Sequence, residues 1–144
     1  MGCDIHAYIE VKADGQWKYY NWRRKHNYGE HQSHLDWERM TNDPLHILRH
    51  YALFAALAGV RNNFNTIPVS KPRGLPSNIT KPVKAISDDW NSDGHTHSWL
   101  TLSEMQNYDF KSAGVYDGWT KTLDAMAELV DDPGNLRLVF FFDC

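Results

Sequence analysis

Two short polar clusters carry residue types suited to proton chemistry near neutral pH. Asp4 and His6 occupy alternate positions near the start of the chain, and His95 and His97 are again separated by one residue. Imidazole gains and loses a proton close to neutrality, so these histidines, with Asp4 beside them, are candidates for general acid–base catalysis. A half-exposed strand would show the first pattern and a hydrogen-bonded polar loop the second, and both of these structural interpretations stay open.

The cluster of Asp4 and His6 could instead bind a divalent metal ion. Asp143 ends an apolar segment near the end of the sequence. If that segment pairs with the first strand, Asp143 approaches Asp4 and His6, and the three side chains could ligate a metal ion. The spacings typical of zinc sites, paired Cys-x-x-Cys or His-Glu-x-x-His, are missing from the sequence.

A bound anion would need cationic donors, and the candidates are Arg61 and Arg73. Arginine offers a planar pair of donors to phosphate or carboxylate, and Gly74 would let backbone N–H groups approach the same anion. Tyr8 and Trp99 are the aromatic candidates for stacking against a base or sugar. Solvent-exposed surface charge remains the simpler interpretation for either arginine taken alone.

The elements that must position these residues predict an α+β fold with a small, mainly antiparallel sheet. Alternation from Cys3 to Lys12, an Asp14-Gly15 turn and a return strand to about Trp22 predict a hairpin. The apolar run within 136–143 predicts a central strand. Helices are expected over 43–59, with Leu48 in its buried stripe, over about 115–130, and after the capping-box sequence at 101–104.

Between these elements the sequence predicts long irregular loops. Residues 60–86 contain four prolines, and 88–98 are polar. Proline interrupts regular structure, and long loops often serve as binding loops or lids. We therefore expect the first loop to close over a ligand.

Composition limits the class of protein. A chain of 144 residues predicts one globular domain spanning 1–144, and a net charge of −3 argues against a duplex nucleic acid partner. No apolar run is long enough to predict a membrane span. Two cysteines, Cys3 and Cys144, predict free thiols in a reducing cytoplasm. Homo-oligomerisation remains open.

Several blocks of the sequence resemble a largely uncharacterised family of small proteins encoded by phages and prophages. The blocks are Met1-Gly2-Cys3-Asp4-Ile5-His6, Leu53-Phe54 with Leu57-Ala58-Gly59-Val60-Arg61, Arg73-Gly74-Leu75-Pro76, His97-Ser98-Trp99-Leu100-Thr101-Leu102, and Arg137-Leu138-Val139-Phe140-Phe141-Phe142-Asp143. Where the family usually has an acidic residue, this chain has Asn78. The resemblance implies a phage setting, in which nucleotide metabolism and the defeat of host defence are common tasks.

Three functions remain as hypotheses. The first is a hydrolase that breaks a phosphodiester or related bond in a small linear or cyclic nucleotide used as a host defence signal. The second is a non-catalytic sponge that binds the same ligand, and the third is a protein inhibitor of a host defence enzyme. Paired histidines with nearby aspartate favour the hydrolase, because a sponge has little need of an acid and a base.

Overall fold

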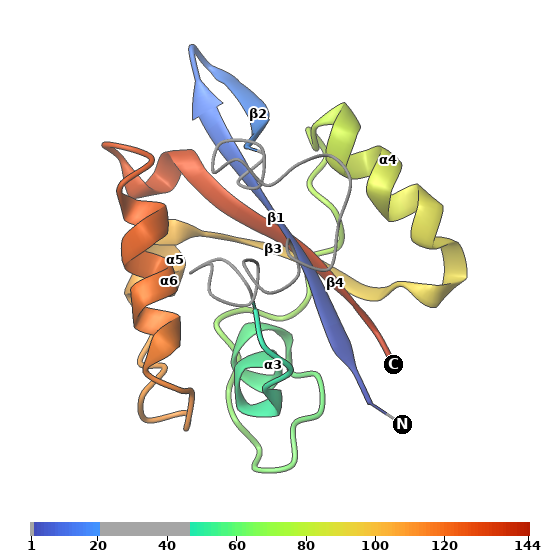
Figure 1. Ribbon diagram of the computed structural model, residues 1–144, viewed down its shortest axis with the longest axis vertical. Helices are drawn as coiled ribbons and strands as arrows, with labels where there is room; N and C mark the ends of the chain where they lie inside the picture. Colours follow the sequence, from blue (N-terminus) through green and yellow to red (C-terminus); the bar gives the residue numbers. More distant parts are fainter. Residues whose placement is uncertain (1, 21–46) are drawn as a thin grey trace, which may run out of the picture.

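The computed structural model describes residues 2–20 and 47–144. Its four strands are β1 (Asp4–Ala13), β2 (Gln16–Tyr20), β3 (His95–Thr101) and β4 (Leu136–Asp143). They form one antiparallel sheet in the order β2-β1-β4-β3 (Figure 1). The described helices are α3 (Tyr51–Ala58), α4 (Lys81–Trp90), α5 (Leu102–Gln106) and α6 (Gly118–Ala127), with single 3₁₀ turns at Asn91–Asp93 and Pro133–Asn135. The α+β class and the antiparallel sheet are therefore confirmed.

The hairpin of β1 and β2 forms at the predicted turn. Asp14 and Gly15 both adopt positive φ, at 52° and 76°, which suits a tight turn with the twist of the flanking strands. Pairing starts immediately beyond them, with Ala13 opposite Gln16. This turn therefore sets the register between β1 and β2.

Strand β4 occupies the interior of the sheet, as its apolar sequence predicts. It pairs with β1 on one side and with β3 on the other, and its residues from Leu136 to Phe142 are buried. Because side chains alternate, β4 contributes to both faces of the sheet. We call the face that carries Phe140 and Phe142 the core face, and the face that carries Asp143 and Phe141 the α4 face.

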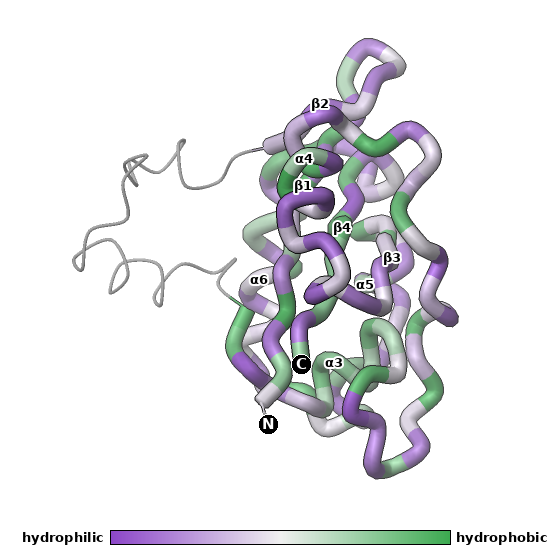
Figure 2. Tube along the Cα trace, turned by 90° about the vertical axis from the view of Figure 1, so that its right-hand side faces the viewer, coloured by the Kyte–Doolittle hydropathy of each residue, from purple (hydrophilic) through white to green (hydrophobic). Residues whose placement is uncertain are grey.

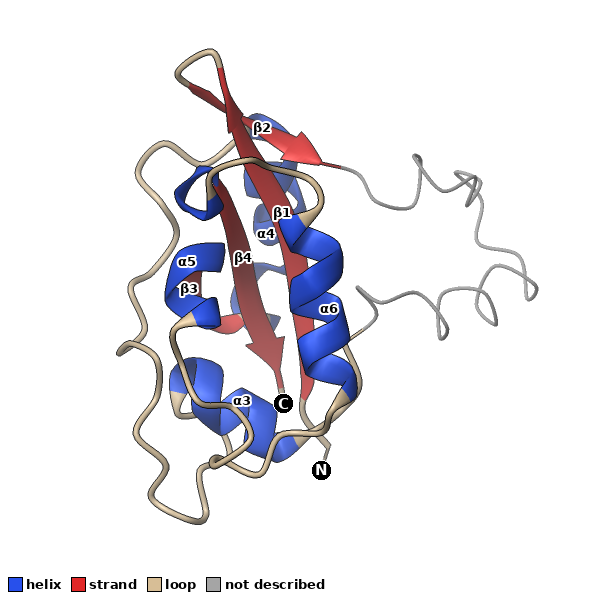
Figure 3. Ribbon diagram, turned by 90° about the vertical axis from the view of Figure 1, so that its left-hand side faces the viewer, coloured by secondary structure: helices blue, strands red, loops and turns tan. Residues whose placement is uncertain are grey.

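Helices α3, α5 and α6 cover the core face, while α4 lies on the opposite side of the sheet (Figure 3). Helix α3 consists almost entirely of apolar residues (Figure 2). Its residues from Leu53 to Ala58 are buried. It ends at Gly59, which has a φ of 73° and donates its N–H to the Ala55 carbonyl. This is the C-terminal stop that the sequence predicts.

The predicted start of that helix is wrong. Residues 47–50 are not helical, and the earlier part of the prediction, 43–46, lies outside the described residues. Leu48 is 48% exposed, so it does not belong to the core. Helix α6 is likewise shorter than the predicted 115–130, although Trp119, Leu123 and Met126 are buried as the periodicity indicates.

The region predicted as two loops contains a helix and a strand. Helix α4 spans Lys81–Trp90 with a proline in its first turn, and β3 begins at His95. Proline is compatible with the first turn of a helix, because the N–H it lacks has no helical acceptor there. The preceding segment packs onto the fold: the Val69 N–H donates to Ala56 and the Gly74 N–H to His97.

The two cysteines are not free thiols. Cys3 and Cys144 flank the paired ends of β1 and β4, where Asp4 lies opposite Asp143, and they form a disulfide. Sequence spacing could not show this, because 141 positions separate them. Among the described residues, no helix has the length and apolarity needed to cross a membrane.

Candidate functional site

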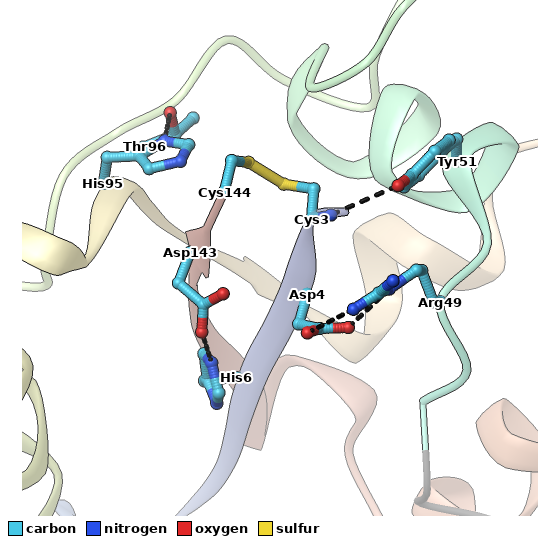
Figure 4. The surroundings of a disulfide bond; sticks show 9 residues. All are labelled: Cys3, Asp4, His6, Arg49, Tyr51, His95, Thr96, Asp143 and Cys144. Atoms are coloured by element: carbon cyan, nitrogen blue, oxygen red, sulfur yellow. Dashed lines mark hydrogen bonds and ion pairs between the residues drawn. A yellow bond between two sulfur atoms is a disulfide. The ribbon is translucent and has the colours of Figure 1, made fainter. Parts of the chain in front are cut away.

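The α4 face places His6 against Asp143. Within the β1–β4 register His6 lies opposite Phe141, so Asp143 is its diagonal neighbour on the same face. The imidazole Nε2 lies 2.6 Å from Asp143 Oδ2, and both side chains are partly exposed, at 23% and 28% (Figure 4). An ionised carboxylate can only accept, so this pair places the proton on Nε2 and leaves Nδ1 as the second polar atom of the ring.

Aromatic rings surround this pair. The Trp90 ring, from the end of α4, lies 4.1 Å from the His6 ring, and the Phe141 ring lies 5.4 Å from it. Tyr8 also contacts Phe141, at 6.2 Å between ring centroids. His6 is therefore held by contacts with two rings and by a carboxylate.

His97, on β3, contacts the Phe141 ring from the other side of β4. Its imidazole stacks on Phe141 with ring centroids 5.2 Å apart, so the rings of His6 and His97 flank Phe141 across three adjacent strands. Phe141 itself is fully buried between them. Partial burial lowers the pKa of His97, and the nearby charge of His95 lowers it further.

A bulge in β3 separates the two neighbouring histidines. The register shifts between His95 and Ser98, and Thr96 has a positive φ of 54°. As a result His95 pairs with Phe142 on the core face, whereas His97 packs on Phe141 on the α4 face. The predicted His95–His97 cluster is thus divided between two sites, because a bulge inserts one residue and reverses the direction of the next.

The described structure does not bring the three predicted metal ligands, Asp4, His6 and Asp143, within metal-ligand spacing of one another. Asp4 accepts two hydrogen bonds from Arg49, at 2.8 and 2.7 Å, and this pairing lowers the pKa of its carboxyl group. Within the described part of the chain, the one group of three side chains with metal-ligand spacing is Cys3, His95 and Cys144.

The predicted anion anchors have partners within the protein. Arg73 binds the Glu104 carboxylate through both terminal nitrogens, donates to the Trp99 carbonyl, and lies 4.6 Å from the Trp99 ring. Arg73 lowers the pKa of Glu104 to about 2. Arg61 instead lies 5.5 Å from the Tyr51 ring on α3. These contacts direct both guanidinium groups to partners other than His6. The Trp99 ring, predicted to stack on a ligand, packs against Arg73 instead.

Sequence reasoning missed a buried ion pair on the same face of the sheet, four residues along β1 from His6. Glu10 and Arg137 face each other across β1 and β4, with side chains 0% and 3% exposed and a separation of 2.7 Å. Arg137 also donates to the Asn78 side chain and carbonyl, and Glu10 accepts the Thr80 N–H at the start of α4. These contacts fasten α4, and hence Trp90, to the sheet. The alternation of β1 places Glu10 on this face, but it does not predict burial.

Comparison of the chain with models of known families, with curated proteins and with solved structures finds no match.

Proposed function

We propose that the protein binds a small phosphate-bearing ligand, most simply a nucleotide, on the α4 face and hydrolyses a phosphodiester or related bond. The observation that carries this proposal is the His6–Asp143 contact of 2.6 Å, with His97 beyond the same Phe141 ring. A histidine oriented by a carboxylate is the usual arrangement of a general base in hydrolytic sites. The partly exposed rings of Tyr8 and Trp90 supply apolar surface for a base.

The reaction needs one base and one acid. One imidazole takes a proton from the attacking water, the new P–O bond forms, and the other imidazole gives its proton to the oxygen that leaves. Two steps between strands separate the two histidine positions by about 9–10 Å. Because Phe141 is fully buried between the imidazoles, the phosphoryl group would lie over the outer, partly exposed edges of the two histidine rings. Asp143 acts by holding the His6 ring in one orientation through the Nε2–Oδ2 contact.

The phage setting implied by the sequence resemblance makes a linear or cyclic nucleotide signal of host defence the expected substrate. The expected location is then the cytoplasm of the host. A nucleotide sponge is the second candidate function, and one observation favours it. Phe141 separates the two imidazoles, so a ligand bound against one of them need not contact the other. The inhibitor of a host enzyme remains the third.

One experiment separates these functions. The protein is incubated with a panel of linear and cyclic nucleotides, and each mixture is read for thermal shift and for product. A shift with product supports the hydrolase, and a shift without product supports the sponge. A panel with neither contradicts both and leaves the protein inhibitor.

His97→Ala is the decisive variant under the hydrolase proposal. Removing one of the two proton-transfer groups should lower turnover by about 10²-fold or more, while folding and ligand binding change little. His50→Gln is the matched control, because His50 packs against Tyr116 outside the site. Equal turnover in His97→Ala and wild type would contradict the role of His97.

A further inference from the structure

Two sulfur atoms and one imidazole meet at one end of the sheet, on the opposite face from the His6–Asp143 pair. Cys3 and Cys144 flank the paired ends of β1 and β4, and the β3 bulge turns His95 to the same place (Figure 4). The two sulfur atoms and one imidazole nitrogen all lie within 4.8 Å of one another. In the disulfide form the sulfurs are bonded to each other and cannot act as thiolate ligands.

We propose that reduction of the Cys3–Cys144 disulfide converts this cluster into a zinc site. Two monothiols of the glutathione type supply the two electrons: their sulfurs form a new disulfide, and the protein gains two thiols. Zn²⁺ then displaces one proton from each thiol and binds two thiolates and the neutral His95 imidazole. Water completes the tetrahedral set, so the site keeps an open position.

The geometry suits this metal. Zinc bonds of about 2.3 Å to sulfur and about 2.0–2.1 Å to nitrogen require the three ligand atoms to lie close together, as they do here. Breaking the disulfide lets the sulfurs separate while the β1–β4 register holds the two backbones. Thiolate and imidazole also favour Zn²⁺ over Mg²⁺ or Ca²⁺, which prefer oxygen ligands.

Thr96 prepares His95 for this role. The Thr96 hydroxyl oxygen lies 2.9 Å from His95 Nδ1. When Nδ1–H donates to that oxygen, the lone pair of Nε2 is left for the metal, as in zinc sites whose histidines are oriented by a second hydrogen bond. The bulge therefore gives the two histidines different tasks: His97 faces the proposed hydrolytic site, and His95 faces the cysteines.

Cobalt titration tests the site directly. Protein reduced with a phosphine under nitrogen is titrated with Co²⁺, and the spectrum is followed for the thiolate-to-cobalt charge-transfer band. We expect one equivalent to bind with this band and with the strong visible bands of tetrahedral cobalt, and Zn²⁺ to displace it. Oxidised protein should show no such band.

Variants assign the ligands. Cys3→Ser with Cys144→Ser keeps every histidine and should abolish the band under all conditions. His95→Ala should weaken binding by at least about tenfold, whereas His50→Ala should not. No band in reduced wild type, or equal affinity in His95→Ala, would overturn the proposal.

Circular dichroism covers the case in which the reduced, metal-free chain loses structure. Zinc should then restore the folded spectrum in wild type and not in the double serine variant, because binding energy at such a site is also folding energy. A reduced chain that stays unfolded with Zn²⁺ present contradicts the site. None of these measurements involves a nucleotide, so the result is independent of the proposed hydrolase.

Discussion

The Arg73–Glu104 pair shows how a single charged residue can serve the fold. Glu104 is the third residue of α5, where its side chain accepts the Thr101 N–H in a capping box. The same carboxylate binds Arg73, which tethers the segment before α4 to the start of α5. Arg73 therefore acts as a structural cation here, although its sequence context fits an anion anchor equally well.

This pair makes stability depend on acid. The Arg73 hydrogen bonds lower the pKa of Glu104 from its usual 4.5 to about 2. Its contribution is therefore complete above pH 4.5 and is lost as the pH falls towards 2. We expect Glu104→Gln to lower the free energy of unfolding at pH 7 by about 1–2 kcal/mol, after allowance for solvent screening, and to have almost no effect near pH 2.

Glutamine keeps the oxygen that accepts the Thr101 N–H, whereas its NH₂ group faces Arg73, so the substitution removes the charge together with one hydrogen bond from Arg73. Urea unfolding of both proteins at about pH 7, 4 and 2.5 measures the difference across the range in which the carboxylate is lost. If the two free energies differ by the same amount at every pH, the ion pair is not the source of the stability.

At the level of elements, the buried Glu10–Arg137 pair connects α4 to the sheet. Glu10 and Arg137 hydrogen-bond to each other, and each also forms a hydrogen bond with a backbone group of residues 78–80. Burying two charges is costly, and their value lies in the position they impose on α4. Trp90, at the far end of that helix, is the ring that covers His6.

Removing one partner of this pair should be severe. We expect Arg137→Met to lower the free energy of unfolding by about 3–5 kcal/mol, because the Glu10 carboxylate is then buried without a counterion. The double variant Glu10→Gln with Arg137→Met should recover much of the loss, since the amide oxygen of the introduced glutamine can still accept the Thr80 N–H. Chemical denaturation of wild type, both single variants and the double variant gives the coupling energy, and simple additivity would contradict the pairing.

Helix α3 offers a second test at this scale. Leu57 is fully buried, whereas Leu48 precedes the helix and is 48% exposed. We expect Leu57→Ala to cost about 2–5 kcal/mol and Leu48→Ala less than about 1 kcal/mol. Urea unfolding measures both, and equal losses would contradict the observed start of the helix.

For the whole molecule, the disulfide joins two segments that are far apart in the sequence. It holds Cys3 and Cys144 beside the end of the β1–β4 pairing. A crosslink over so long a loop restricts the unfolded chain, so it stabilises the folded one by an amount that grows slowly with loop length.

Reduction in the presence of a chelator should therefore lower the free energy of unfolding by about 3–5 kcal/mol. The chelator keeps zinc from compensating for the loss. The double variant Cys3→Ser with Cys144→Ser is the control, because its stability should not respond to reductant. Unchanged unfolding of reduced wild type would show that the crosslink contributes little.

Local features of this protein follow from its sequence. The alternation of β1, the Asp14-Gly15 turn, the stop at Gly59, the capping box at Thr101 and the apolar β4 all appear where predicted. Each depends on backbone preferences or on alternation within a few residues, so neighbouring positions specify it. His6, His97 and Asp143 are recognisable as candidates for the same reason: residue type and strand context are local properties.

Long-range features were decided only by the tertiary structure. The buried and half-buried positions of helix α4 are Val83, Ile86, Ser87 and Trp90, and the prolines and charges around them hide that stripe in the sequence. The β3 bulge reverses the side chain of His97 relative to His95, and no local pattern marks where a bulge will form. The Cys3–Cys144 bond and the His6–Asp143 contact follow from the antiparallel register of β1 and β4. Register is set by the packing of the entire sheet, and the energy of that packing is distributed over segments that lie far apart in the sequence.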